Sequence, residues 1–146
     1  NNKWGFINDK GEIKIPIQFY SVNLFVNGIA PVCFELGRCM FIHHNLDMAI
    51  KEVYSDCYSF SEGLAAIKEK SGKWGSIDST GNLVIPAKYD EVKSFSNGFA
   101  AVKSNKKWGY INKKGETILE LEYDNLSSIN NYLGALKFQP GGYWHI

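Results

Sequence analysis

The sequence has little of what marks a membrane protein, a nucleic-acid-binding protein or a disulfide-rich domain. Its formal net charge is only +1, whereas nucleic acids and anionic membranes select basic surfaces. No apolar run approaches the roughly 20 residues that a membrane-spanning helix needs. Cysteine occurs three times, an odd number and too few for a disulfide framework. We therefore expect neither a nucleic-acid partner nor a membrane span.

Catalytic signatures are missing as well. The chain has no Gly-rich phosphate loop, no G-x-S-x-G nucleophile motif and no H-E-x-x-H metal motif. Several acidic residues fall in predicted turns, where Asp often hydrogen-bonds its own backbone: Asp9, Asp78, Asp90 and Asp124. We expect no enzyme activity, no catalytic residues and no cofactor.

The sequence carries no visible signal peptide and begins at Asn1 rather than at Met. We therefore expect a fragment of a larger protein. The compartment stays open between the cytoplasm and the cell surface or exterior.

The chain does contain ample core material and a repeated motif. Hydrophobic residues make up 45% and aromatic residues 14%, which argues against disorder. The tripeptide Lys-Trp-Gly begins at Lys3, Lys73 and Lys107. The isoleucine three residues after each Trp belongs to a series spaced by 34 or 35 residues: Ile7, Ile42, Ile77, Ile111 and Ile146. This period predicts a single repeat domain over residues 1–146. Its repeats cover about 3–37, 38–72, 73–106 and 107–141, with a partial fifth at 142–146.

Further positions keep the same phase. One column is aromatic in every repeat: Phe19, Tyr54, Tyr89 and Tyr123. The second repeat is degenerate, because Cys39 and Met40 stand where Trp and Gly are expected.

One repeat reads as three short strands, for example over 64–69, 73–78 and 82–86. The two loops between them have three residues and end in Gly72 and Gly81, which suits hairpin turns whose last residue is left-handed. These turns place Ala65 opposite Ile77, and Ile77 opposite Leu83. The predicted core face therefore consists of Ala65, Ile67, Ile77, Leu83 and Ile85.

The opposite face carries the row Lys68, Trp74 and Pro86, in which the Lys stem is expected to lie along the indole. Gly75, in the middle strand, would let another segment pack closely. The stretch after the third strand has apolar residues three apart, which indicates a helical turn or an anchored loop.

The predicted architecture is an all-β tandem array of three-stranded antiparallel units, forming a solenoid or superhelix. Closure into a β-propeller is the alternative. The segments KWGFINDKG, KWGSIDSTG and KWGYINKKG, with IPAKYD and FSNGFAAVK, resemble the WG-repeat family of bacterial proteins. That resemblance covers essentially the whole chain. It implies a β-repeat array that binds or scaffolds, and it implies no active-site residues.

Two side-chain groups are candidate sites. Trp4, Trp74 and Trp108 could form a stripe of exposed aromatic platforms for sugars or a partner; the competing interpretation is that they are packed between repeats. Cys33 and Cys39 lie opposite each other in the predicted register, within disulfide distance.

A metal site at the same place is not expected. Cys39 and His43 are four strand positions apart, roughly 13 Å, which is too far for shared Zn²⁺ ligation. Cys57 occupies an apolar column and is expected to be buried.

We therefore predict a protein-interaction or scaffold module with an unidentified protein partner. The first alternative is a carbohydrate- or cell-wall-binding module that uses exposed aromatics, with a glycan as partner. The second is a self-assembling segment, because uncovered strands are templates for another chain. Exposure of the three tryptophans separates the first two hypotheses.

Overall fold

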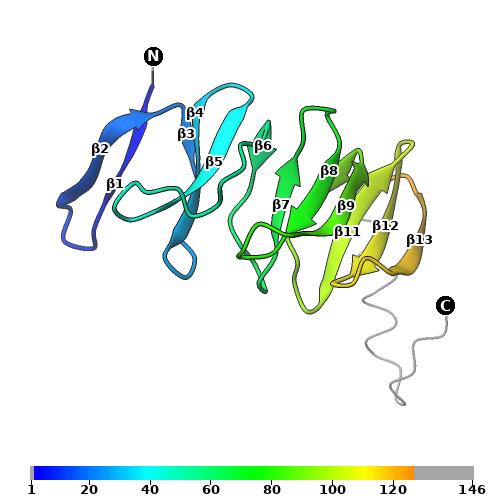
Figure 1. Cartoon of the computed structure of the whole chain (residues 1–146). Coiled ribbons are helices and arrows are strands. Elements are labelled where there is room, and N and C mark those ends of the chain that lie inside the picture. The colour runs from blue at the N-terminus through cyan, green and yellow to red at the C-terminus, as the bar shows by residue number, and fades with distance from the viewer. Residues whose placement is uncertain (1, 127–146) are drawn as a thin grey trace.

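The computed structural model describes residues 2–126, and these residues form an all-β molecule (Figure 1). The strands are β1 (Trp4–Ile7), β2 (Ile13–Phe19), β3 (Ser21–Val22), β4 (Ile29–Glu35), β5 (Arg38–His43), β6 (Asp56–Cys57), β7 (Ala65–Lys68), β8 (Trp74–Ile77), β9 (Leu83–Tyr89), β10 (Glu91–Val92), β11 (Phe99–Ser104), β12 (Lys107–Asn112) and β13 (Thr117–Tyr123). Within this part of the chain no helical segment has the length and hydrophobicity of a membrane span.

The strands form four small antiparallel sheets, which follow one another along the molecule (Figure 1). Their strand orders are β1-β2, β3-β4-β5, β6-β7-β8-β9 and β10-β11-β12-β13. β1 and β13 lie at opposite ends of this row. Over residues 2–126 the arrangement is therefore an open array, as the sequence predicts, and not a closed propeller.

Tight turns join the neighbouring strands of each unit. Gly72 and Gly81 adopt φ values of 85° and 89°, the left-handed conformation that glycine takes without strain. In the third repeat the turn shortens to Asn105 and Lys106, both with positive φ, as a two-residue type I′ hairpin requires. This shorter turn explains the single 34-residue spacing.

The predicted register is confirmed between the first two strands, where Ala65 pairs with Ile77 and Lys68 with Trp74. It is wrong for most of the third strand. Ile77 does face Leu83, but the register then shifts, so that Ser76 pairs with Ile85 and Trp74 with Tyr89. Extra residues in β9 form bulges, and each one-residue slip turns the side chains to the other face.

The predicted core face changes accordingly. Ile85 packs with Trp74 and Tyr89 on one side of its sheet, whereas Ala65 and Ile77 pack on the other. Leu83 is exposed, and so is Pro86, which does not lie beside Trp74.

The glycine after each Trp makes this bulge sterically feasible. A Cβ on Gly75 would lie 2.4 Å from the carbonyl oxygen of Ile85, closer than atoms can approach. Gly5 and Gly109 have equivalent contacts, at 2.5 Å and 2.4 Å, with the carbonyls of Ile15 and Leu119. The close approach predicted at this column is therefore confirmed, and the segment that approaches is the bulged third strand.

The degenerate repeat shows what happens without that glycine. Met40 occupies the column, and the third strand is reduced to isolated bridges from Met48 to Ile42 and from Tyr54 to Cys39. The second sheet accordingly ends at β5. The loss of Trp-Gly thus coincides with the loss of a regular third strand.

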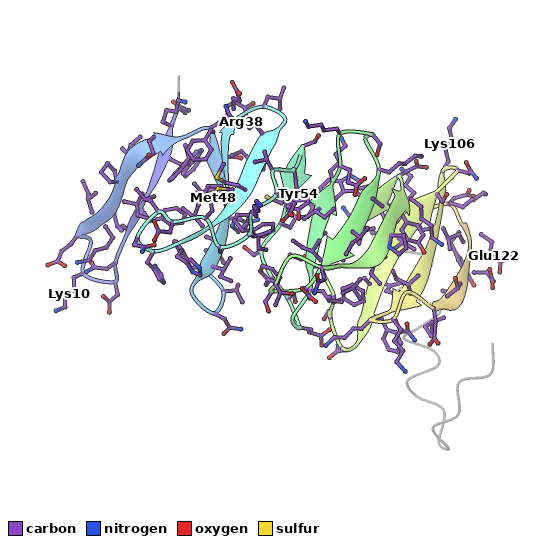
Figure 2. The ribbon with its side chains drawn as sticks, viewed as in Figure 1. Lys10, Arg38, Met48, Tyr54, Lys106 and Glu122 are labelled. Carbon is purple, nitrogen blue, oxygen red and sulfur yellow. A yellow bond between two sulfur atoms is a disulfide. The ribbon has the colours of Figure 1, made fainter. Side chains whose placement is uncertain are left out.

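Each sheet packs face to face on the next, and the core lies in layers between them. Tyr54, for example, belongs to the layer between the second and third sheets (Figure 2). The chain crosses between sheets at single residues such as Asp90, which separates β9 from β10.

The connector after this crossing is an anchored loop and contains no helical turn. It begins with the short strand β10 and contains Phe95, which is buried between the third and fourth sheets. The three-residue spacing of its apolar residues arises from these anchor points.

Candidate interaction surface

The lysine of each later Lys-Trp-Gly motif forms an ion pair with the aspartate after the aromatic column. Lys73 Nζ lies 2.5 Å from Asp90 Oδ1, and Lys107 Nζ lies 2.5 Å from Asp124 Oδ1. The hydrogen bond from Lys73 lowers the pKa of Asp90, and the backbone N–H of Asn105 also donates to this carboxylate. These groups are solvent-exposed, so the pairs orient the chain more than they stabilise it.

Two of the three motif tryptophans are buried. The hypothesis that all three form an exposed aromatic stripe is therefore wrong. Trp74 stacks on Tyr58, with ring centroids 5.1 Å apart and planes at 10°. Trp108 is buried beneath two lysines, Lys93 at 5.7 Å and Lys103 at 5.4 Å from the ring centroid. Tyr58 and Lys93 belong to the connectors that precede β7 and β11. Strand-pairing rules alone do not predict where these connectors lie.

Trp4 is different, with 56% of its surface exposed. It pairs with Phe19 across β1 and β2, as Trp74 pairs with Tyr89. Among the described residues no connector precedes β1 to cover its ring. The three tryptophans therefore do not form one surface.

The structure joins Cys33 and Cys39 by a disulfide between β4 and β5, with their Cα atoms 4.0 Å apart. Cys57 is a free, buried thiol whose pKa is raised by burial. A carboxylate oxygen of Asp56 lies within 4.8 Å of both bonded sulfurs. Because a disulfide offers no thiolate, this trio does not constitute a metal-ligand set.

The histidines near this bridge do not join it. His44 instead stacks on Phe25, with ring centroids 4.0 Å apart, and His43 is exposed at the end of β5. The cysteines and histidines that are adjacent in sequence thus serve separate structural purposes.

Exposed large apolar side chains are most frequent within the first 53 residues, and sequence reasoning missed this. Leu83 and Val84 are the exceptions from later repeats within residues 2–126; the others are Trp4, Ile7, Ile13, Ile17, Tyr20, Leu24, Phe34, Leu36, Leu46, Met48 and Val53. The missed signal was positional: Ile7 occupies the buried column of Ile77, but among residues 2–126 β1 pairs with β2 alone.

A hollow of about 410 Å³ adjoins this surface, lined by Phe6, Ile7, Asn8, Lys14, Ile15, Phe25 and His44. The turn after β5 contributes His44 to its lining. There Leu46, with φ of 73°, replaces the glycine that in the next two units (Gly81 and Gly115) packs on the preceding isoleucine.

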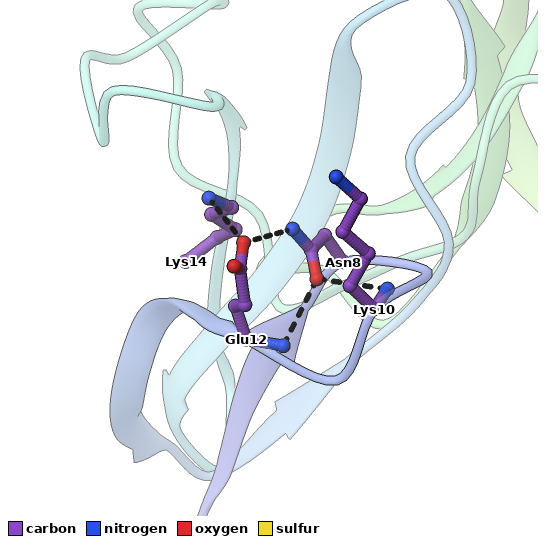
Figure 3. A network of polar contacts seen from close by, with 4 residues as sticks. All are labelled: Asn8, Lys10, Glu12 and Lys14. Carbon is purple, nitrogen blue, oxygen red and sulfur yellow. Dashed lines mark hydrogen bonds and ion pairs between the residues drawn. The ribbon is translucent and has the colours of Figure 1, made fainter.

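The rim of the hollow is a polar network at the β1–β2 turn (Figure 3). Asn8 Oδ1 accepts backbone hydrogen bonds from Lys10 at 3.0 Å and Glu12 at 2.9 Å. Asn8 Nδ2 donates to the Glu12 carboxylate at 2.7 Å, and Lys14 lies 3.2 Å from it. The network secures the turn and neutralises Lys14, which leaves the hollow mainly apolar.

Comparison with known proteins bears on the repeats. A family model described as "WG containing repeat" matches residues 4–35, 40–74, 74–108 and 108–135. A search of the curated proteins gives no match.

Proposed function

The chain belongs to the WG-containing repeat family, and from this premise we propose that it is a non-catalytic protein-interaction or scaffold module. Within the described repeats the motif Trp and Gly mainly serve the fold. Residues that bind a partner are therefore sought outside the motif.

The observation that carries the proposal is the apolar surface of the first two sheets. Single exposed apolar residues are ordinary, but exposed apolar residues that are neighbours are typical of a binding surface, and Ile7 pairs with Ile13 across β1 and β2. On β1 and β2 the exposed side chains include Ile7, Ile13 and Ile17. Burying aliphatic side chains beneath another protein lowers the free energy. These side chains offer neither the flat surface nor the polar groups that bind and orient a sugar.

The carbohydrate alternative rests on exposed aromatic platforms. The burial of Trp74 and Trp108 counts against it, and Trp4 is the one motif tryptophan left for stacking. A module that bound glycans through the repeated Trp would need it exposed in several repeats.

The test is photo-crosslinking in the cells that make the protein. A photoreactive amino acid at Ile17, exposed on β2, is expected to give discrete adducts with protein. The same group at Lys113, exposed in the β12–β13 turn, serves as the matched control. Absence of protein adducts at Ile17, or the same adducts from both positions, would contradict the proposal. A glycan array with the wild-type chain and Trp4→Ala tests the alternative.

A further inference from the structure

The disulfide of the degenerate repeat occupies the place where the next repeat carries a lysine beside a tryptophan. Cys33 and Cys39 pair across β4 and β5. One repeat later the same two columns hold Lys68 and Trp74, which pair across β7 and β8. Both cysteines are buried in the layer between the second and third sheets. Two sulfurs therefore lie side by side at a position where the fold otherwise packs a ring.

A carboxylate from the third sheet reaches the same point. Asp56 is the first residue of β6, and one of its carboxylate oxygens and the two sulfurs all lie within 4.8 Å of one another. Cys39 and Tyr54 exchange two backbone hydrogen bonds of 2.8 Å, which hold the start of this segment against β5. The Asp56 carboxylate also accepts a hydrogen bond from the backbone N–H of Cys57 at 2.9 Å. Two sulfurs and one oxygen from neighbouring sheets thus converge.

The oxidised chain cannot use these groups as ligands, because bonded sulfurs are not thiolates. A dithiol reductant changes this. It supplies two electrons and two protons, the Cys33–Cys39 bond breaks to give two thiols, and the reductant leaves as its own disulfide. A divalent metal ion can then bind both sulfurs as thiolates and release the two thiol protons to solvent.

We propose that the reduced chain binds one Zn²⁺ ion through Cys33, Cys39 and Asp56, with one coordination position left for water. The ligand types select this ion. Mg²⁺ and Ca²⁺ take oxygen ligands and disfavour sulfur, whereas Cu(I) is suited to soft sulfur ligands and disfavours a carboxylate. Zn²⁺ accepts thiolate and carboxylate together in tetrahedral geometry.

The spacing of the three groups suits a tetrahedral ion. With Zn–S bonds of about 2.3 Å, two thiolates on one Zn²⁺ lie about 3.8 Å apart. Directly opposed residues of an antiparallel pair project from the same face. Once the bond is broken, each sulfur can turn about its own Cα–Cβ bond. Cys33 and Cys39 can therefore move to ligand distance while the backbone of β4 and β5 stays in place.

Access to the buried sulfurs follows from the missing third strand of the degenerate repeat. Within residues 2–126 the outer edge of β5 is paired through isolated bridges, Cys39 with Tyr54 and Ile42 with Met48. In the next unit β8 pairs along that edge with the regular strand β9. A segment held by few backbone contacts opens at a lower free energy than a core strand. A reductant and an ion can therefore reach Cys39 without unfolding of the whole chain.

Titration of the whole chain with Co²⁺, a spectroscopic substitute for Zn²⁺, provides the test. The chain is first reduced with a phosphine, which is oxidised to the phosphine oxide and then removed under argon. Co²⁺ should produce the ultraviolet thiolate-to-cobalt charge-transfer band and the intense visible bands of a tetrahedral site, and Zn²⁺ should abolish them by displacing cobalt. The unreduced chain, which keeps every histidine and carboxylate, should give neither. A reduced chain without these bands, or equal bands from both forms, would overturn the proposal.

A matched pair of carboxylate variants tests the third ligand. Asp56→Asn can keep the hydrogen bond with the backbone of Cys57 but loses the charge. It should weaken Zn²⁺ binding at least about tenfold, since even changes outside the direct ligands reduce metal affinity by that factor. Glu91→Gln is the control, because Glu91 occupies the same column in the next repeat, where no cysteine pair is present. Equal affinities of the two variants would contradict a role for Asp56.

The remaining cysteine and the folded state provide the last controls. Cys57→Ala should bind Zn²⁺ as the wild type does, and its loss of binding would show that a different set of thiols holds the ion. Zn²⁺ should raise the melting temperature of the reduced wild type and leave that of the oxidised chain unchanged, because an ion that binds the native state stabilises it. No rise in the reduced chain would assign the cobalt bands to unfolded protein and overturn the proposal. These measurements do not involve Ile17, so the proposed interaction function is judged separately.

Discussion

The backbone of Ile85 crosses Gly75 so closely that a Cβ on the glycine would lie 2.4 Å from the Ile85 carbonyl oxygen. This contact explains the Gly of the repeated motif. The bulged third strand can turn Ile85 toward the next sheet only if the middle strand has no side chain at this point. The Lys of the motif forms an ion pair, Lys73 with Asp90. The Trp of the motif contributes a buried ring, Trp74.

Gly75→Ala should therefore destabilise the fold by about 3 kcal/mol, because backbone cannot yield as a flexible side chain can. Urea unfolding would measure this free energy. Gly63→Ala is the control: its left-handed φ of 82° leaves space around the missing Cβ, so only about 1 kcal/mol of backbone strain is expected. Equal losses from the two variants would mean that the contact at Gly75 is unimportant.

Ser76→Ala should leave the fold as stable as the wild type or stabilise it by about 1 kcal/mol. Ser76 is buried, and its Oγ has no hydrogen-bond partner, so the change removes a desolvated polar group. Ser61→Ala is the contrasting control, because the Ser61 Oγ donates to the carbonyl of Phe95 at 2.6 Å. Its removal should cost about 1 kcal/mol. Thermal unfolding of both variants compares them, and a marked loss for Ser76→Ala would show that its hydroxyl is bonded in solution.

The repeats and the first hairpin of each unit could be predicted from the sequence because their determinants are local. Glycines at turn ends fix the loop length, and the loop length fixes the pairing of Ala65 with Ile77. The Cys33–Cys39 pairing across β4 and β5 follows from the same rule.

The third strand and the burial of the tryptophans depend on contacts between segments. The bulge at Ile85 requires a neighbouring strand that leaves room for it. Gly75 provides that room, but a glycine alone does not show that a bulge is present. Trp74 is covered by Tyr58 from the connector, and pairing rules do not place connectors. The exposure of Ile7 depends on which strand lies beside β1. The sequence of its own repeat does not determine that neighbouring strand.

Acrylamide quenching should distinguish the tryptophans. Trp4→Phe is expected to lower the quenching constant of the whole chain, because Trp4 is exposed. Trp74→Phe should raise it, because the variant removes a shielded emitter stacked on Tyr58. Trp144 lies outside the described residues and is present in both variants, so their difference does not depend on it. Opposite changes would contradict the burial of Trp74.

Thiol titration should find one reactive cysteine in the denatured, unreduced chain and none in the native chain, because Cys57 is buried and its pKa is raised by burial. Reduction before denaturation should give three. The double change Cys33→Ser with Cys39→Ser should lower the free energy of unfolding by about 2 kcal/mol, the expected entropic contribution of so short a loop. Three thiols without reduction would show that the bond is not formed.

Alkaline pH should weaken the fold through Tyr54. Burial, followed by the nearby Glu52 carboxylate, raises the pKa of this phenol to about 12 in the folded chain, against about 10 for an exposed tyrosine. The stabilisation by the neutral phenol is complete below pH 10. It is lost as the pH rises toward 12, because the unfolded chain releases the proton first. Tyr54→Phe should fold, since Phe19 occupies the same column in the first repeat, and should lose less stability over this window. Urea unfolding at pH 8, 10 and 11 compares the two chains; parallel losses would assign the alkaline transition to other tyrosines, among which burial also raises the pKa of Tyr58 and Tyr110.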